Sequence, residues 1–202
     1  MSFSKHTLGR RACLVLATIG LLAGQAWAQD AAAAPKVKFA TSAGDFVVEV
    51  YPDKAPKTVA NFLQYVKDKH YDGTVFHRVI DNFMVQGGGF DAAYAQKPTR
   101  APVVHEGREA LTKGGDKNVV GTLAMARTND PNSASSQFFI NVRDNDFLNP
   151  SAQTPGYTVF GKVVSGMEVV NKIKATPTGA GGPFPGDVPK TPVLINSATL
   201  VK

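Results

Sequence analysis

Short runs of alternating apolar and polar residues dominate the chain downstream of Pro35. Val37 to Thr41 alternates, a polar break follows at 42–45, and a second β-rich run extends from Phe46 to Tyr51. Successive side chains of a strand point to opposite faces, so two alternating runs joined by a short break predict a β-hairpin. Further strands are predicted at 75–80, 83–86, 119–126, 137–142, 158–164 and 193–201.

Two segments show the helical period instead. Pro56 suits the first position of a helix, and the apolar residues that follow it recur at i, i+3, i+4 and i+7: Val59, Phe62, Leu63 and Val66. A second, shorter helix is predicted from the capping-box spacing at 165–168. Many short strands, one helix near each end and no alternation of strand with helix indicate an antiparallel barrel or sandwich. The stretch 179–186 is a Gly- and Pro-rich tract of low complexity.

The first 28 residues have the pattern of a secretory signal peptide. Lys5, Arg10 and Arg11 form a basic region, an uncharged apolar run follows at 12–23, and 26–28 is an A-x-A cleavage site. A retained membrane anchor is the alternative, but the apolar run is shorter than the roughly 20 residues that span a bilayer. We therefore expect cleavage after residue 28. The arginine pair leaves the choice between the general secretory and the twin-arginine route open.

The mature chain is expected to consist of a flexible stub, 29–36, and one domain, 37–202. Removing 28 of the 202 residues removes three cations and no acid, so the net charge falls from +6 to +3. This charge gives no reason to expect a nucleic-acid or membrane partner. The single cysteine, Cys13, lies in the leader, so the domain depends on its core rather than on disulfides. Without a heptad or a long apolar edge, we expect a monomer.

Several kinds of active site find no support in the sequence. His70, His77 and His105 are scattered without the spacing of a metal site, and we interpret them as structural histidines with satisfied hydrogen bonds. The glycine run 87–89 is not a phosphate-loop pattern, and the serines at 133–136 lack the G-x-S-x-G elbow. We therefore expect no metal, no cofactor and no hydrolytic machinery.

The segment around Arg78 combines charge with apolar neighbours. Two interpretations of Arg78 fit this pattern. Its charge has a role in function, or it is a surface arginine whose aliphatic part covers apolar residues while the guanidinium stays in water. Further along, strand alternation places Met84 and Gln86 on one face, with Phe83 and Val85 on the other.

The segment 136–141 has a similar pattern. Gln137 and Phe139 are expected on one face, and Phe138 and Ile140 on the opposite face. The two segments thus each present an amide beside a large apolar side chain. A peptide-binding groove needs this combination of an apolar pocket and a few placed hydrogen-bonding groups.

Three segments together resemble a known family. FHRVIDNFMVQGGGF at 76–90, LAMARTNDPNSASSQFFI at 123–140 and YTVFGKV at 157–163 resemble the signature segments of cyclophilins, the cyclosporin-binding peptidyl-prolyl isomerases. The resemblance extends from about residue 37 to residue 202. Together with the export signal, it makes the chain most similar to periplasmic cyclophilins of Gram-negative bacteria. It implies a mainly β fold, an eight-stranded antiparallel closed β-barrel capped by two α-helices. It also implies a cofactor-independent isomerase that accelerates X-Pro bond rotation in exported, folding polypeptides of the periplasm.

The resemblance assigns roles to individual positions. Arg78 matches the catalytic arginine of the family, and Gln86 matches the glutamine that binds the substrate backbone. Ala126 and Arg127 fall where the family pairs its main chain with the peptide. The other matched residues form the proline pocket or its groove: Phe83, Met84, Gln137, Phe139, Phe147, Leu148 and Tyr157.

Three positions depart from the usual pattern. Arg127 replaces an asparagine, a change that is tolerable if only its backbone is used. Phe147 stands where many eukaryotic members have tryptophan, and Tyr157 where they have histidine. Because Phe147 keeps the apolar wall but has no indole N–H donor, we expect weaker cyclosporin binding than in tryptophan-bearing relatives.

Two other classes of function stay open at this point. A binding module or holdase would use the same groove without catalysing rotation, although capturing proline would not require the guanidinium of Arg78. A structural β-barrel protein without a site would not explain why Arg78, Gln86 and Gln137 all fall in the matched groove segments.

Overall fold

The computed structural model describes residues 1–3 and 34–201. Apart from residues 1–3, the predicted leader at 1–28 lies outside the described residues, as do residues 29–33 of the predicted stub. The Pro35 carbonyl accepts a hydrogen bond from the Val50 N–H at 2.9 Å, and Lys36 is the first residue of a strand. The hydrogen-bonded fold therefore includes the end of the segment that we assigned to the stub.

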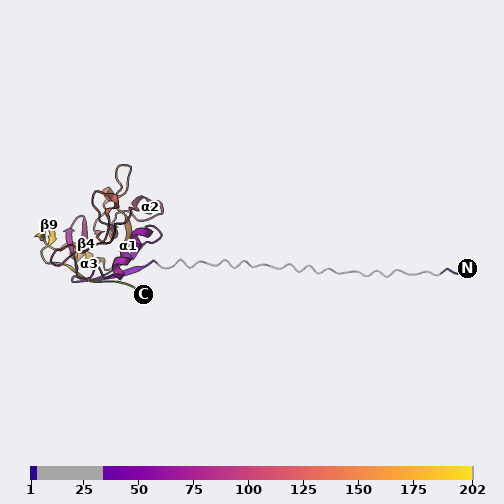
Figure 1. The fold of residues 1–202 in the computed structure, drawn as a ribbon, viewed down its shortest axis with the longest axis horizontal. Coiled ribbons are helices and arrows are strands. Elements are labelled where there is room, and N and C mark those ends of the chain that lie inside the picture. Colours follow the sequence, from indigo (N-terminus) through magenta and orange to yellow (C-terminus); the bar gives the residue numbers. More distant parts are fainter. Residues whose placement is uncertain (4–33, 202) are drawn as a thin grey trace. The chain divides into compact units, whose positions relative to one another are not determined.

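Of the ten strands within the described residues, eight close into one barrel, which confirms the predicted architecture (Figure 1). The neighbours around it follow the order β1-β10-β3-β4-β6-β5-β7-β2, and every pairing is antiparallel. The ten strands are β1 (Lys36–Thr41), β2 (Gly44–Val50), β3 (Thr74–Ile80), β4 (Met84–Asp91), β5 (Thr122–Met125), β6 (Phe138–Asn141), β7 (Val159–Ser165), β8 (Thr178–Gly181), β9 (Phe184–Pro189) and β10 (Leu194–Leu200).

Aromatic rings fill the barrel interior. Phe39 of β1 stacks on Phe46 of β2 with ring centroids 5.0 Å apart, and it packs against Phe138 of β6 at 5.4 Å. Phe62 of the first helix adds a fourth ring, 6.3 Å from Phe39. The three strand residues occupy inward positions, so the period-2 pattern of the strands and the apolar stripe of the helix together specify the core.

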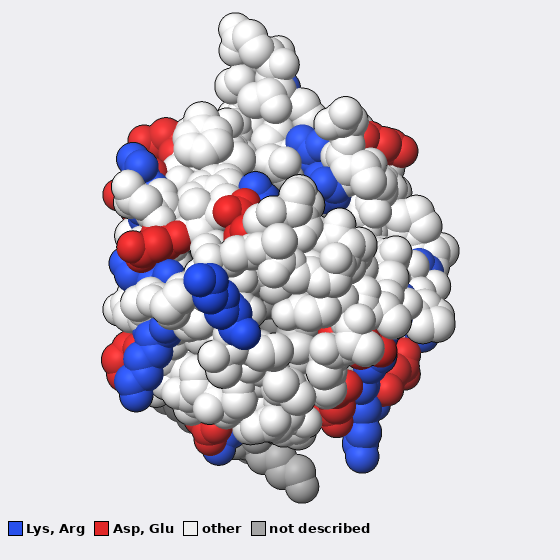
Figure 2. Space-filling view, turned by 90° about the vertical axis from the view of Figure 1, so that its left-hand side faces the viewer, with Lys and Arg blue, Asp and Glu red and all other residues white. Residues whose placement is uncertain are grey.

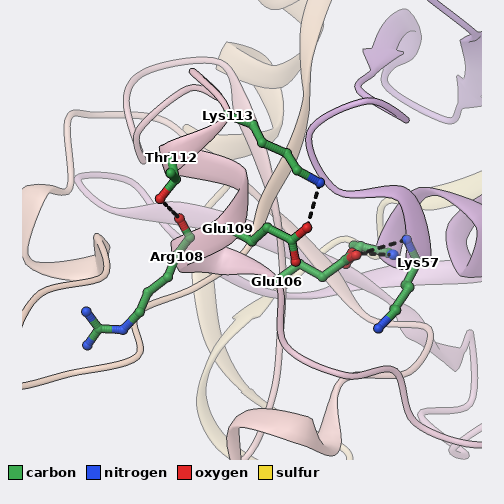
Figure 3. Close-up of polar contacts among 7 residues, drawn as sticks. Lys57, Glu106, Arg108, Glu109, Thr112 and Lys113 are labelled. Atoms are coloured by element: carbon green, nitrogen blue, oxygen red, sulfur yellow. Dashed lines mark hydrogen bonds and ion pairs between the residues drawn. The ribbon is translucent and has the colours of Figure 1, made fainter.

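The helix α1 (Pro56–Lys67) has the predicted stripe, with Val59, Phe62 and Val66 buried and Leu63 half-buried. Its N-terminus has no local side-chain cap. Instead Glu106, distant in sequence and only 3% exposed, accepts hydrogen bonds from the Lys57 N–H at 3.1 Å and the Thr58 N–H at 2.7 Å (Figure 3). The carboxylate thus lies at the positive end of the helix dipole.

The described residues contain both predicted helices and one further α-helix that the sequence pattern did not reveal. The additional helix is α2 (Gly107–Thr112), and the third is α3 (Met167–Lys174). Two 3₁₀ turns, η1 (Pro131–Ser133) and η2 (Asp146–Leu148), complete the set. With six residues, of which only Gly107 and Ala110 are buried, α2 has no apolar stripe that the sequence pattern could show.

The start of α3 also differs from the prediction. Ser165 is the last residue of β7 and caps nothing, and Gly166 is the N-cap residue with φ of 82°. A Cβ at Gly166 would lie 2.5 Å from the Asp45 carbonyl oxygen. The capping-box prediction was wrong because a tight strand-to-helix turn against neighbouring backbone requires glycine here.

The low-complexity tract 179–186 contains a hairpin that the sequence did not reveal. Strands β8 and β9 pair with each other outside the barrel, and Figure 1 shows β9 at one edge of the body near β4. The chain gives no alternating signal here because glycines occupy strand positions. A Cβ at Gly181 would lie 2.8 Å from the Val188 side chain, so the close approach of Val188 explains why position 181 is a glycine.

The surface carries both signs of charge. On the face drawn in Figure 2, lysines and arginines are interspersed with aspartates and glutamates, and no continuous basic stripe crosses that face. A basic stripe is the usual footprint of nucleic-acid binding. Among the described residues, no helix combines the length and the apolar character needed to cross a membrane.

Candidate active site

The barrel register brings residues from distant segments into one row. Arg78 of β3 pairs with Gln86 of β4, Gln86 pairs with Phe139 of β6, and Phe139 pairs with Ala124 of β5. Residues paired across antiparallel strands present their side chains on the same face. Phe138, the chain neighbour of Phe139, is fully buried in the barrel core, so the row lies on the opposite face. The predicted division of the two faces in β6 is confirmed.

A cavity of about 100 Å³ opens beside this row. Its apolar members Met84, Phe139 and Leu148 are buried and belong to a small cluster separate from the barrel core. Nine of the eleven residues proposed for the site line the cavity: Arg78, Phe83, Met84, Gln86, Ala126, Arg127, Phe139, Leu148 and Tyr157. An apolar pocket with a few polar groups is suited to holding a compact apolar ring in one orientation.

Phe83 corrects one prediction made from alternation. We expected its side chain on the face opposite Met84, but Phe83 packs with Met84 in the pocket cluster. Phe83 precedes β4, in a turn closed by its N–H donating to the Ile80 carbonyl at 3.0 Å, and the period of a strand does not apply there. The buried Asn145 fixes this turn by donating from Nδ2 to the Phe83 carbonyl at 3.0 Å.

Gln137 lies next to the pocket rather than in it. It lines an adjoining cavity of about 290 Å³ to which Gln86, Ala126 and Arg127 also contribute, so these three residues border both hollows. Gln86 donates from Nε2 to Gln137 Oε1 at 2.9 Å. A Cβ at Gly89 would lie 2.5 Å from Gln137 Cγ, so the Gln137 side chain leaves room only for glycine at this position of the run 87–89.

The Arg127 side chain is bound to the neighbouring segment at Gly156 and Tyr157. Its Nε and Nη2 donate to the Gly156 carbonyl at 3.1 and 2.8 Å, and the guanidinium lies 4.5 Å from the Tyr157 ring centroid. Within the described part of the chain, the Arg127 N–H makes no hydrogen bond. The arginine in place of asparagine therefore leaves the main chain at 127 able to pair with a peptide.

Phe147 is the second proposed residue that does not line the pocket. It is 68% exposed, and its ring stacks on Phe83 at 5.7 Å with an interplanar angle of 25°. Phe147 therefore extends the aromatic wall outward from the pocket.

Sequence reasoning missed one charged neighbour of the site. The Arg78 side chain is 44% exposed, and its Nε lies 3.8 Å from Oδ2 of Asp187 on β9. Asp187 follows the tract that we interpreted as low complexity. A single carboxylate beside glycines carries no signal that would place it near an arginine more than a hundred positions earlier.

The histidines are only partly as expected. The Nε2 atoms of His70 and His105 each lie 3.2 Å from a backbone carbonyl oxygen, of Gly88 and Gly156 respectively. His77 contradicts the expectation of satisfied histidines, because its buried Nδ1 has no hydrogen-bond partner among residues 1–3 and 34–201. Burial lowers the pKa of His77 to about 4, so the ring is neutral at neutral pH. Within the described residues, no three His, Cys, Asp or Glu side chains gather into a metal-binding group.

Comparisons with known proteins agree with this geometry. The family model described as cyclophilin type peptidyl-prolyl cis-trans isomerase/CLD matches residues 36–200. Peptidyl-prolyl cis-trans isomerase B of Escherichia coli is 52% identical over 167 residues, covering 81% of this chain and 98% of that protein. Peptidyl-prolyl cis-trans isomerase A of Dickeya dadantii is 44% identical over 195 residues, covering 96% of this chain and 100% of that protein.

Solved structures show the same fold. A crystal structure of a cyclophilin type peptidyl-prolyl cis-trans isomerase from Cryptosporidium parvum aligns with a TM-score of 0.67 at 25% identity, covering 84% of this chain and 98% of that one. A second crystal structure of that isomerase, obtained in the presence of the dipeptide Ala-Pro, aligns with a TM-score of 0.66. The chain belongs to the cyclophilin-type peptidyl-prolyl cis-trans isomerases. It is thus an isomerase of X-Pro peptide bonds that acts on proline-containing peptides.

Proposed function

We propose that this isomerase accelerates X-Pro rotation in exported polypeptides that are folding in the periplasm. The support is the leader pattern at 1–28, a basic region, a short apolar run and an A-x-A site, which precedes the isomerase domain in the chain. Newly exported chains arrive unfolded, and slow X-Pro isomerisation limits the folding of such chains.

Within the site, we propose that Arg78 is the catalytic residue and that the pocket anchors the proline ring. Resonance makes the C–N bond partly double, so the barrier to rotation is about 18–20 kcal/mol. Twisting the amide localises the lone pair on the proline nitrogen. A guanidinium near that nitrogen bonds the twisted amide better than the planar one, because only the twisted nitrogen is a good acceptor.

The other residues position the peptide in this proposal. The ring lies against Met84, Phe139 and Leu148, and Gln86 binds the chain on one side of the bond. The main chain of Ala126 and Arg127 pairs with the peptide. No covalent bond breaks in the rotation, so the chemistry itself calls for no cofactor.

The magnitudes are compatible with one charged donor and good positioning. Uncatalysed exchange takes roughly tens to hundreds of seconds. Bringing it to milliseconds requires about 10⁴- to 10⁵-fold acceleration, or roughly 6 kcal/mol. A charge-assisted hydrogen bond that forms only in the twisted state, together with a held peptide, supplies energies of this order.

The observation that carries the proposal is the register that places Arg78 beside the apolar pocket, and Arg78→Ala tests it. We expect kcat/KM on an Ala-Pro-containing peptide to fall about 10²- to 10³-fold, while peptide affinity changes much less. Arg100→Ala is the matched control, because Arg100 is an exposed arginine paired with Asp68 at 2.9 Å and lies outside the groove. Unchanged kcat/KM in folded Arg78→Ala would refute the role.

The same variant separates the enzyme from the holdase. If Arg78→Ala loses isomerisation but still prevents aggregation of an unfolded client, the groove has both roles. Holdase activity alone would be indicated by wild-type protein that binds X-Pro peptides without accelerating their rotation.

Export is tested with the full chain expressed in a Gram-negative host. We expect the protein in the osmotic-shock fraction, with an intact mass and an N-terminal sequence that begin at Gln29. Protein that keeps residue 1 and remains with the cytoplasmic fraction would contradict the proposed location.

A further inference from the structure

The β8–β9 hairpin lies against β3, beside Arg78. Phe184 of β9 packs on the His77 ring at 5.4 Å and meets the Phe90 ring edge-on at 5.0 Å. Tyr94 adds a third ring, 6.3 Å from Phe184. Because these aromatic contacts join β9 to the barrel next to the site, residues of β9 keep a defined position relative to Arg78.

Asp187 is the residue of β9 that approaches the site. Its backbone is in the left-handed region, with φ of 64°, a conformation that Asp and Asn tolerate better than other residues with a Cβ. Its Oδ2 lies 3.8 Å from Nε of Arg78, and both side chains are about half-exposed. The contact is to Nε, so the two terminal nitrogens of the guanidinium are left for the substrate.

Arg78 also stands between two hollows. It lines the proline pocket, and it lines a second cavity of about 370 Å³ together with His77 of β3 and with Phe184 and Asp187 of β9. An arginine side chain has several rotatable bonds, and here it has open space on both sides. A restraint is therefore needed if its terminal nitrogens are to stay near the proline pocket.

We propose that Asp187 is a positioning residue, whose carboxylate restrains the Nε end of Arg78 so that the terminal nitrogens remain available to the proline nitrogen. The inference rests on the proposed catalytic role of Arg78. An ion pair this exposed adds little to stability, so its effect belongs to the rate rather than to folding.

Asp187→Asn tests the proposal with the backbone preserved, because Asn also accepts the left-handed conformation. On an uncharged Ala-Pro peptide we expect kcat to fall about fivefold with KM unchanged. We also expect the order parameter of the Arg78 Nε–H bond, from nitrogen-15 relaxation, to fall, while Tm stays the same. Asp187→Gly, which removes the side chain at a φ that glycine favours, should lower kcat at least as much.

Asp45→Asn is the matched control, because it breaks an exposed pair with Lys38, at 2.7 Å, in the β1–β2 hairpin. We expect it to change neither kcat nor the Arg78 order parameter. In an Arg78→Ala background, adding Asp187→Asn should cause no further loss, since Asp187 acts through Arg78.

The outcomes distinguish the two proposals. If Arg78→Ala keeps the wild-type rate, the catalytic role of Arg78 fails, and the positioning role fails with it. If Arg78→Ala collapses the rate but Asp187→Asn matches or exceeds the wild type, only the positioning role is wrong. The positioning role is also wrong if the Asp187→Asn loss lies in KM or persists undiminished without Arg78.

Discussion

His77 lies next to Arg78 in the chain but belongs to the packing of the hairpin. Its ring packs against Phe90 at 4.6 Å and Phe184 at 5.4 Å, and its Nδ1 has no hydrogen-bond partner in the part of the chain that the structure describes. Burial holds its pKa at about 4 in the folded chain, against 6.5 for an ordinary histidine. At pH values between these two pKa values, His77 is protonated in the unfolded chain but not in the folded chain. The free energy of unfolding therefore falls as pH decreases through this range.

The expected contribution of His77 is a loss of roughly 3 kcal/mol in the free energy of unfolding between about pH 6.5 and pH 4. Urea denaturation of wild type and His77→Phe at pH 7 and pH 4.5 measures it. We expect the difference between the two pH values to be smaller in His77→Phe, whose ring does not titrate. Equal differences in the two proteins would show that His77 is not responsible.

Because Phe147 replaces a tryptophan, we expect this isomerase to bind cyclosporin less tightly than relatives that have the tryptophan. Its ring is largely exposed and stacked on Phe83, so a larger indole ring meets no buried neighbour there. Phe147→Trp adds an N–H donor, and we expect about a fivefold to tenfold tighter Kd for cyclosporin, measured by calorimetry. Phe147→Leu, which adds no donor, should not tighten binding. No gain with tryptophan would remove this explanation.

Single residues were predictable where a strand fixes the side-chain direction. The faces of Gln137, Phe138 and Phe139 followed from alternation, and the structure confirms the opposite placement of Phe138 and Phe139. The same rule was wrong for Phe83, which belongs to a turn. Asp187 had no local pattern at all, because only the docked hairpin places it beside Arg78.

Among the elements, α1 depends on a cap that its own sequence does not contain. The buried Glu106 carboxylate accepts from the Lys57 and Thr58 N–H groups and from the Thr58 hydroxyl at 2.7 Å, and Figure 3 shows it reaching the start of the helix. This contact joins the loop before α2 to a helix that contributes to the barrel core. Glu106 is therefore an anchor between the two segments.

Glu106→Gln keeps the size of the side chain but turns an acceptor of three hydrogen bonds into a group that also presents N–H donors. We expect a loss of about 2–3 kcal/mol in the free energy of unfolding, measured by urea denaturation. Glu109→Gln is the matched control, because Glu109 lies on the adjacent helix in an exposed pair with Lys113 at 2.6 Å (Figure 3). It should leave the midpoint unchanged. Equal effects of the two changes would contradict the capping role.

The elements missed by the sequence share a physical cause. The helix α2 is too short to show a helical period, and β8 and β9 contain glycines where a strand pattern would have side chains. The predicted strand 119–126 shortens to β5 because Gly121, with φ of 84°, turns the chain before Thr122. Long amphipathic elements such as α1 are visible in sequence, whereas elements stabilised mainly by tertiary contacts are not.

At the scale of the whole molecule, the site is a product of strand order. Around the site the strand order is β3-β4-β6-β5, in which β4 and β6 are neighbours although β5 lies between them in the chain. The consecutive strands β3 and β4 pair Arg78 with Gln86, and the β4–β6 neighbourhood adds Phe139 to the row. Patterns within one sequence identify the strands and their faces, but they do not determine which strands become neighbours across long connections. The resemblance to cyclophilins implied a closed eight-stranded barrel, and the order of its strands came from the structure.

In the function proposed above, Arg78 is a catalyst of rotation rather than a binding group. NMR exchange spectroscopy on an X-Pro peptide at equilibrium measures that rotation directly, with residues 29–202 as wild type and as Arg78→Ala. We predict rapid cis–trans exchange with the wild type and its loss with the variant, although both bind the peptide. Equal exchange with the two proteins, or no exchange with a wild type that binds the peptide, would contradict a catalytic role of Arg78.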